Sequence, residues 1–273
     1  MGTFGRRLLL AVDAKGYGGV DVVTQRQLQE AIQRLLGEAA VAAGLARERW
    51  ETQVGGDSVF AVLPEGASEP DLVDPFIRHL DAGLREFNRN RVREAWLRLR
   101  AAVHFGTAAP AANGFEGRGP VEIGRILDSK VLRAALAAAP EACLALAVSA
   151  TVFNDVIGEA YTTIRAQDFR EVRIAEKEYA GRAWIWVPGY DAKSLDLGGE
   201  GLGGESAGGV VGGALDAGGA VATGAPGSAG GGTADSARPL NAPSAPTRAS
   251  DTVVQVFSGG TINAHGAVFG ISK

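Results

Sequence analysis

Residues 51–63 have the sequence ETQVGGDSVFAVL, and this stretch decides the fold. Two β-prone runs, 51–54 and 59–63, flank a Gly-Gly-Asp-Ser segment at 55–58. Glycine adopts the backbone angles of a tight turn more readily than other residues, so a Gly-Gly pair between two such runs is typical of a β-hairpin. The stretch therefore predicts two antiparallel strands with Asp57 in the turn that joins them.

Strand and helix patterns alternate on both sides of this hairpin. Residues 7–12 form a short apolar run that predicts a buried strand. Downstream of it, apolar residues recur at helical spacing up to Gly44, and Thr24 with Gln27 fits the start of a helix. Further helices are predicted at 70–91 and 121–136, and further strands at 96–106, 144–148, 169–174 and 183–187. This pattern predicts an α+β domain, residues 1–190, with a central sheet flanked by helices.

Two aspartates stand where these predicted strands meet turns. Asp13 ends the first strand and is followed by Gly16 and Tyr17, whereas Asp57 lies in the hairpin. A strand end beside a hairpin turn can bring two carboxylates together, and two adjacent carboxylates need a cation. Hard ions such as Mg²⁺ prefer oxygen ligands and often share them with substrate phosphates. Each aspartate taken alone is more often a residue of an ordinary turn, or a helix cap, than a metal ligand.

Composition excludes several classes of protein. The net charge of −4 gives no electrostatic footprint for nucleic acid. The single cysteine, Cys143, lies in an apolar run and predicts a buried, inert thiol. The apolar run after Arg6 and Arg7 is far shorter than a membrane span, so we expect a cytoplasmic protein without a membrane partner.

The last third of the chain has a different composition. Residues 198–235 contain 16 glycines and few large apolar side chains, so they cannot bury enough surface to offset the entropy of ordering. We therefore predict a disordered linker, rich in Gly, Ala, Pro and Ser, over 191–250. Residues 251–273 regain β-prone runs and carry no charge between Thr252 and Ser272, which is typical of a segment that assembles as cross-β structure.

Four stretches of the first domain, in this order, resemble the catalytic domain of class III nucleotidyl cyclases, which has a ferredoxin-like fold. The resemblance covers about residues 6–188. It is carried by residues 12–17 (VDAKGY), the hairpin 54–62, residues 99–106 (LRAAVHFG) and residues 119–129 (GPVEIGRILDS). The stretches 172–177 and 183–188 look like an actinobacterial branch of that family.

The resemblance implies a phosphorus–oxygen lyase that makes a 3′,5′-cyclic nucleotide. In the family, two Mg²⁺ or Mn²⁺ ions held by the counterparts of Asp13 and Asp57 bind a nucleoside triphosphate. They activate the ribose 3′-hydroxyl to attack the α-phosphate, and pyrophosphate leaves. Arg125 matches an arginine that the partner subunit donates, so the resemblance implies a homodimer. Residues matched to nucleotide contacts are Gly16, Tyr17, Gln53, Gly55, Gly56 and Lys177.

Some residues depart from the family's pattern. Val121 stands where the family has a ribose-binding asparagine, and Gln53 stands where it has a purine-reading lysine. His104, within an apolar strand, is expected to be a packed and hydrogen-bonded core residue. Diguanylate cyclases have a metal-binding glutamate directly after the hairpin aspartate. Ser58 stands at that position here, which weakens the interpretation of this chain as a diguanylate cyclase. Because of Val121, a degenerate cyclase-fold adaptor stays open as the alternative function.

The C-terminal segment resembles RHIM-like amyloid signalling motifs of bacterial immune-type proteins. Such a motif templates onto a matching motif in a partner protein, which implies recruitment to a signalling complex. A terminal strand that docks on the first domain, or a tail without a role, stays open as the alternative. The residues that carry the resemblance are Val254, Gln255, Val256, Gly259, Gly260, Gly266, Val268 and Gly270.

Overall fold

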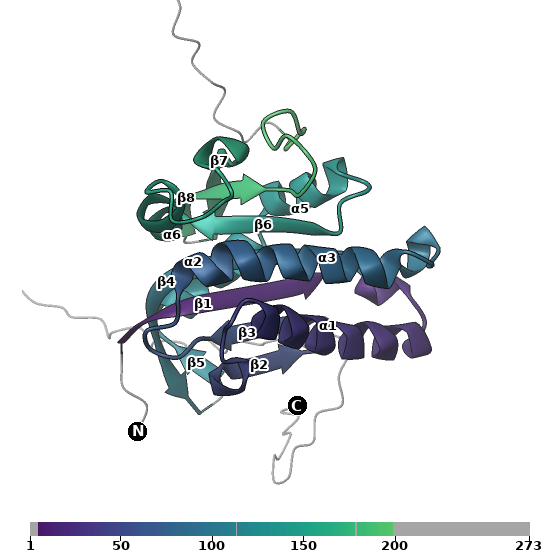
Figure 1. Cartoon of the computed structure of the whole chain (residues 1–273), viewed down its shortest axis with the longest axis horizontal. Helices are drawn as coiled ribbons and strands as arrows, with labels where there is room; N and C mark the ends of the chain where they lie inside the picture. The colour runs from purple at the N-terminus through teal and green to yellow at the C-terminus, as the bar shows by residue number, and fades with distance from the viewer. Residues whose placement is uncertain (1–4, 113, 178, 199–273) are drawn as a thin grey trace, which may run out of the picture. The chain divides into compact units, whose positions relative to one another are not determined.

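A single mixed sheet organises the domain. The computed structural model describes residues 5–112, 114–177 and 179–198 (Figure 1). The main path of the sheet has the order β2-β3-β1-β4-β6-β8-β7, with β5 paired to β4. Every neighbouring pair is antiparallel except β4 and β6. The strands are β1 (Gly5–Ala14), β2 (Glu51–Gly55), β3 (Ser58–Val62), β4 (Leu99–Ala111), β5 (Gly114–Glu116), β6 (Leu144–Ser149), β7 (Arg170–Glu176) and β8 (Tyr179–Trp186).

The first four long strands and two helices form a ferredoxin-like unit, as predicted. In chain order this unit is β1, α1 (Val22–Ala42), β2, β3, α3 (Ile77–Asn88) and β4. Its strands have the order β2-β3-β1-β4, so the first strand lies between the third and fourth. Figure 1 shows α1 and α3 side by side along one face of the sheet, and their residues are in contact.

The two faces of β1 have separate cores. Leu8 and Leu10 belong to a cluster with residues of α1 and α3, whereas Leu9 and Ala11 belong to a second cluster with α4 (Arg118–Leu127) and α5 (Lys130–Ala138). This alternation follows from the period of two in a β-strand. Asp13 continues the odd-numbered series of Leu9 and Ala11, so the sheet face under α4 and α5 also carries Asp13.

Helix α1 begins earlier than the sequence prediction. Its N-cap is Asp21, not Thr24, because the Asp21 carboxylate accepts hydrogen bonds from the backbone N–H groups of Val23 and Thr24 at 2.9 and 3.0 Å. The Thr24 hydroxyl donates to the same carboxylate. The prediction was wrong because both residue types cap helices and a position three residues later also fitted a capping box.

The predicted single helix over 121–136 is wrong, because the structure has two helices there. Helix α4 ends at Leu127, and Ser129 caps α5 by accepting a hydrogen bond from the Leu132 N–H at 3.3 Å. The Ser129 hydroxyl also donates to the Ile126 carbonyl, so one buried side chain ends one helix and begins the next. Ser129 is 1% exposed. The sequence pattern did not indicate that this serine is buried between two helices.

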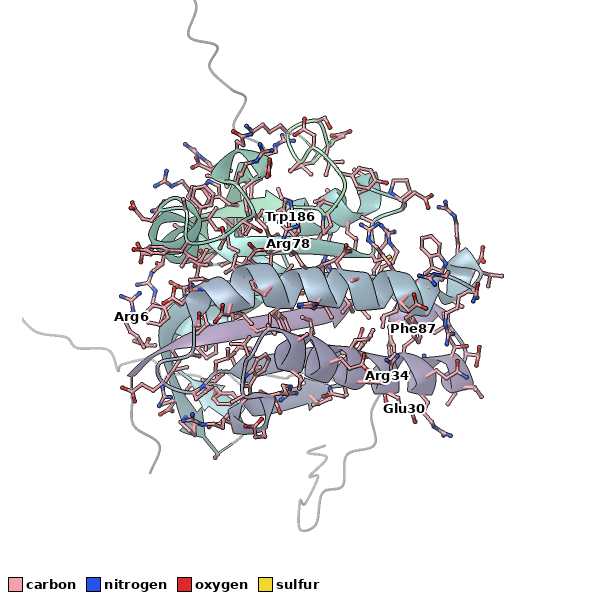
Figure 2. The ribbon with its side chains drawn as sticks, in the orientation of Figure 1. Arg6, Glu30, Arg34, Arg78, Phe87 and Trp186 are labelled. Carbon is pink, nitrogen blue, oxygen red and sulfur yellow. The ribbon has the colours of Figure 1, made fainter. Side chains whose placement is uncertain are left out.

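The segment predicted as a helix at 70–91 is nearly continuous. A short helix α2 (Glu69–Asp71) passes through a wider turn at Leu72–Phe76, which contains Pro75, into α3. Proline cannot donate the regular helical hydrogen bond, which accounts for the irregular turn. From the start of α3, the Arg78 guanidinium lies 6.0 Å from the centre of the Trp186 ring on β8 (Figure 2).

The remaining elements complete the second half of the sheet. The short helix α6 (Ala150–Val152) follows β6. After β8, Leu195 and Leu197 remain buried against the cluster of α4 and α5.

Cys143 is buried and free, as predicted. Among the described residues, no helix is long and apolar enough to cross a membrane.

Candidate functional site

The register of β1 and β3 brings the two predicted aspartates to one end of the sheet. Asp13 on β1 is directly opposite Ser58 on β3, which is the next residue after Asp57. The backbone N–H of Ala14 donates to the Asp57 carbonyl at 3.0 Å. The expectation that strand end and hairpin turn meet is therefore confirmed for the backbone, and both aspartates are half-buried.

Glycines make the two turns at this end possible. Gly16 has φ of 82° and Gly56 has φ of 58°, a region that side chains with a Cβ adopt only with strain. A Cβ on Gly55 would lie 2.9 Å from the Ser58 hydroxyl, which donates to the Gly55 carbonyl at 3.0 Å. Ser58 thus closes the hairpin.

The loop after β1 and the hairpin turn meet through a residue that the sequence analysis missed. Gln29 of α1 donates from its amide to the Tyr17 hydroxyl. The same amide nitrogen lies 3.9 Å from the position that a Cβ on Gly56 would take. Tyr17 itself packs against the core under α1. Helical spacing predicted that Gln29 lies on α1. Only the folded structure shows that its side chain lies between the loop after β1 and the hairpin turn.

The second missed residue is Arg100. It lies opposite Asp13 on β4, and its guanidinium forms an ion pair with the Asp13 carboxylate. Arg100 is 9% exposed, and among the described residues its Nε and Nη1 have no hydrogen-bond partner. Burial and the nearby charge of Arg133 lower the pKa of Arg100. An arginine within the largely apolar strand 99–106 indicates a buried charge that needs a partner. The sequence does not show which residue this is, because Asp13 is 87 residues away in the chain.

The two aspartates fit a magnesium-type ion that is shared with a ligand. Carboxylate oxygens are the donors that such ions prefer, and Mg²⁺ is often held by one or two carboxylates with substrate phosphates completing its coordination. Within the described residues there is no group of three or more His, Cys, Asp or Glu side chains that could hold a metal alone. Asp13 would have to share its carboxylate with Arg100 and the ion.

A cleft of about 270 Å³ opens beside the hairpin, between the sheet face and α4. The rings of Phe60 and Phe115 form part of its wall, with centres 5.3 Å apart and an edge-on arrangement. Gln53 also lines it, and a Cβ on Gly114 would lie 2.5 Å from the Gln53 side-chain oxygen. Gly114, the first residue of β5, therefore lies close against Gln53 at the cleft, and the sequence analysis did not predict this strand.

Helix α4 contributes the opposite wall of this cleft through Pro120, Gly124 and Leu127. Val121, at the position of the family's asparagine, is 55% exposed and is not among the residues that line the cleft. Arg125 is half-buried on the same helix.

Close backbone packing holds the start of α4 against β4. A Cβ on Gly106 would lie 3.1 Å from the Gly119 Cα, and a Cβ on Gly119 would lie 2.8 Å from the Thr107 carbonyl oxygen. His104 is 5% exposed beneath this crossing, which confirms the prediction that it is packed in the core. The prediction that it is hydrogen-bonded is wrong within the described residues: Nε2 lies 3.1 Å from a Glu122 carboxylate oxygen, but neither ring nitrogen has hydrogen-bond geometry to any of them. Burial lowers the pKa of His104, although the Glu122 charge opposes this.

Lys177 lies at the other end of the sheet from the two aspartates. Asp13 is opposite Arg100, near the start of β4, whereas Val103 of β4 is paired through Val148 with Trp184 of β8. Strand β8 begins five residues before Trp184, and Lys177 precedes that start in the turn from β7. Lys177 is exposed and has φ of 53°. One chain therefore does not bring Lys177 to Asp13 and Asp57.

The predicted assembly residues, Val254 to Gly270, and the predicted linker beyond residue 198 lie outside the described residues.

Comparison with known proteins gives structural likenesses only. No protein-family model matches the chain, and no curated protein matches it. The similar solved structures include the guanylyl cyclase Cya2, which is 14% identical with a TM-score of 0.46 over 72% of this chain and 98% of that chain. The adenylyl cyclase CyaB from P. aeruginosa is 15% identical, with a TM-score of 0.46 over 68% and 95%. An adenylate/guanylate cyclase/hydrolase from Silicibacter pomeroyi is 18% identical, with a TM-score of 0.46 over 68% and 99%.

Proposed function

We propose that this protein converts a nucleoside triphosphate into a 3′,5′-cyclic nucleotide and pyrophosphate. The observation that carries the proposal is the β1–β3 register, which sets Asp13 beside the Asp57 turn at the edge of a cleft. Two half-buried carboxylates and two glycine turns at one sheet end suit a metal-bound triphosphate. The ordered sequence stretches that resemble nucleotidyl cyclases give the reaction.

Asp13 and Asp57 are the residues that would hold Mg²⁺ or Mn²⁺, two ions in the proposed form. When bound, such ions lower the pKa of a hydroxyl and stabilise charge on phosphate oxygens. The chain's own contribution is to position the carboxylates: Ala14 donates to the Asp57 carbonyl, and Arg100 orients the Asp13 carboxylate.

In this proposal, different residues around the aspartates contact different parts of the nucleotide. The glycine turns at Gly16 and Gly56 let phosphates approach backbone N–H groups. Within the described part of the chain, the Arg100 Nε and Nη1 have no hydrogen-bond partner, and its guanidinium would neutralise phosphate charge. Gln53, at the cleft wall with two phenylalanines, would contact the base through its amide.

The proposed active form is a homodimer. Because Lys177 lies at the far end of the sheet from Asp13, a site that uses both needs two chains. In this arrangement Arg125 and Lys177 of one subunit would meet the phosphates held by Asp13 and Asp57 of the other. A guanidinium at that place would stabilise charge on the phosphorus as the 3′-oxygen attacks.

The test is incubation of the purified protein with each of the four common nucleoside triphosphates and Mn²⁺, with products read by mass spectrometry. We expect one or two cyclic nucleotides with matching pyrophosphate, and their loss in Asp57→Asn. Asp155→Asn, an exposed aspartate away from the site, is the matched control. Equal product from wild type and Asp57→Asn would refute the assignment.

A cyclase-fold adaptor without activity is the second candidate, and one observation favours it. The Asp13 carboxylate already has a cationic partner in Arg100, so its presence does not by itself require a metal. Exposed Val121 at the ribose position is a further reason. Absence of any cyclic product, even at high protein concentration, would favour the adaptor.

Recruitment of a partner through residues 251–273 is a separate part of the proposal. An uncharged, β-prone terminal segment suits templated assembly with a matching motif, which would raise the local concentration of the domain and so its dimerisation. Deletion of residues 250–273 should then lower activity and oligomer size when a partner with such a motif is present. No change on deletion would contradict this role.

A further inference from the structure

Three glutamines, Gln25, Gln29 and Gln33, recur at intervals of four residues on α1. All three are half-buried, whereas Arg26 and Gln27 between the first two are exposed. Residues four apart lie on the same side of an α-helix, so these glutamines form one row. A side-chain amide that is removed from water needs hydrogen-bond partners. Among the described residues, only the first two glutamines of the row have them.

The first two glutamines hold the loop at 15–21, which joins β1 to α1. The Gln25 amide donates to the carbonyl oxygens of Tyr17 and Val20, at 3.4 and 3.2 Å. The Gln29 amide donates to the Tyr17 hydroxyl. Three residues of this loop are glycines, which lose more conformational freedom on ordering than other residues do. The hydrogen bonds from α1 therefore offset part of the cost of holding the loop in one conformation.

Gln29 also lies over the turn of the β2–β3 hairpin. Its amide nitrogen is 3.9 Å from the position that a Cβ on Gly56 would take. Within the described residues, no other atom beyond the chain neighbours of Gly56 comes within 4 Å of that position. Gly56 directly precedes Asp57. Tyr17, the hydrogen-bond partner of Gln29, follows Asp13 by four residues. One amide thus lies between the two segments that carry the aspartates.

We infer that Gln29 is a positioning residue that fixes the spacing of Asp13 and Asp57 before an ion binds. It acts through the Tyr17 hydroxyl, because this hydrogen bond holds the loop after β1 against the hairpin turn. Two carboxylates that are already held in place bind a shared ion more tightly, since binding then has less of the chain to order. The role of the ion rests on the proposed function, whereas the link between loop and turn can be measured without any ion.

The first measurement is hydrogen exchange, read by mass spectrometry, on the full chain without metal or nucleotide. We expect Gln29→Met to raise the exchange rates of the loop at 15–21 and of the turn at 55–58 about fivefold, because a hydrogen bond between them is lost. Tyr17→Phe should give the same change, and the double variant no further change, since the two side chains form one link. Additive effects, or unchanged exchange at the turn in Gln29→Met, would overturn the inference.

Gln33→Met is the matched control. Gln33 is half-buried one turn farther along the row, and its side chain has no hydrogen bond among the residues that the structure describes. Methionine keeps nearly the shape of glutamine without its amide, so both substitutions test hydrogen bonding and not packing. Exchange in the loop and in the turn should not change in Gln33→Met. A rise equal to that in Gln29→Met would show a general effect of α1 and contradict the role of Gln29.

The second measurement is Mn²⁺ binding with a non-hydrolysable nucleoside triphosphate present, read by electron paramagnetic resonance. Gln29→Met should weaken Mn²⁺ binding about fivefold, and Gln33→Met should leave it unchanged. A lower urea midpoint in Gln29→Met with unchanged Mn²⁺ affinity would show a purely structural role and overturn the inference. A wild type that binds no Mn²⁺ would refute the proposed function and the positioning role together. The exchange rates would still decide whether Gln29 links the loop to the turn, so the two failures are distinguishable.

Discussion

The two ends of the β1–β4 strand pair differ in their surroundings, although each has polar residues of similar types nearby. At one end, Asp13 pairs with Arg100 beside glycine turns and a cleft. Toward the other end, Gly106 and Gly119 nearly touch at a backbone crossing, and His104, opposite Leu9 in the middle of the strand pair, faces Glu122 beneath it. A cleft lies beside the first place, whereas the backbones approach closely at the second. Polar chemistry alone therefore does not mark a site; space beside it does.

The comparison is tested most strongly by changing the two aspartates separately. Asp13→Asn should destabilise the domain by about 3 kcal/mol, because it leaves the buried Arg100 guanidinium without its charged partner. Asp57→Asn should change the free energy of unfolding by less than about 0.5 kcal/mol, since Asp57 is a half-buried turn residue with no ion-pair partner among the residues that the structure describes. Both should abolish cyclase activity. Urea denaturation followed by circular dichroism measures the difference, and equal stability losses would contradict the separation of roles.

At the closed end, Gly106→Ala should cost about 2 kcal/mol. The new Cβ would lie 2.4 Å from His104 Nε2 and 3.1 Å from the Gly119 Cα, so the helix or the strand must shift. Gly37→Ala on α1 is the control, because a Cβ there meets nothing within 4 Å and should stabilise the helix by about 0.5–1 kcal/mol. Thermal melts of both variants check this, and a neutral Gly106→Ala would show that the crossing is loose.

The pH dependence of stability should report on the same end. Because burial lowers the pKa of His104 below its usual value, the unfolded chain binds the proton more readily than the folded one. Stability should therefore be full above about pH 6.5 and fall as the pH drops below the unfolded value. Glu122 opposes this effect, whereas Arg6 and Arg118 add to it. Urea midpoints at several pH values should fall less steeply in His104→Gln; identical slopes would show that His104 does not titrate this way.

The smallest expected effect concerns the break between α4 and α5. Ser129→Ala should cost about 1 kcal/mol, because the Leu132 N–H loses its cap. Ser149→Ala is the contrasting variant, since its buried hydroxyl has no hydrogen-bond partner among the described residues and its removal should be neutral or stabilising. If both serines gave the same change in unfolding free energy, Ser129 would not act as the cap.

Local patterns predicted the hairpin, the first strand and the meeting of Asp13 with the Asp57 turn. These depend on period-two alternation and on glycine turns, which are encoded within about ten residues. The α4–α5 break was missed because the buried apolar residues keep a helical spacing on both sides of Ser129. Arg100 and Gln29 were missed for another reason: their partners come from other strands or loops, and only the folded register brings them together.

We propose above all that Asp13 and Asp57 would hold a divalent ion together with a nucleoside triphosphate. The most direct measurement is Mn²⁺ binding, followed by electron paramagnetic resonance, with a non-hydrolysable triphosphate present. We predict that the wild type binds the ion with the nucleotide, that Asp57→Asn loses it, and that Asp155→Asn keeps it. Nucleotide binding that needs no Mn²⁺, or unchanged Mn²⁺ binding in Asp57→Asn, would contradict the claim.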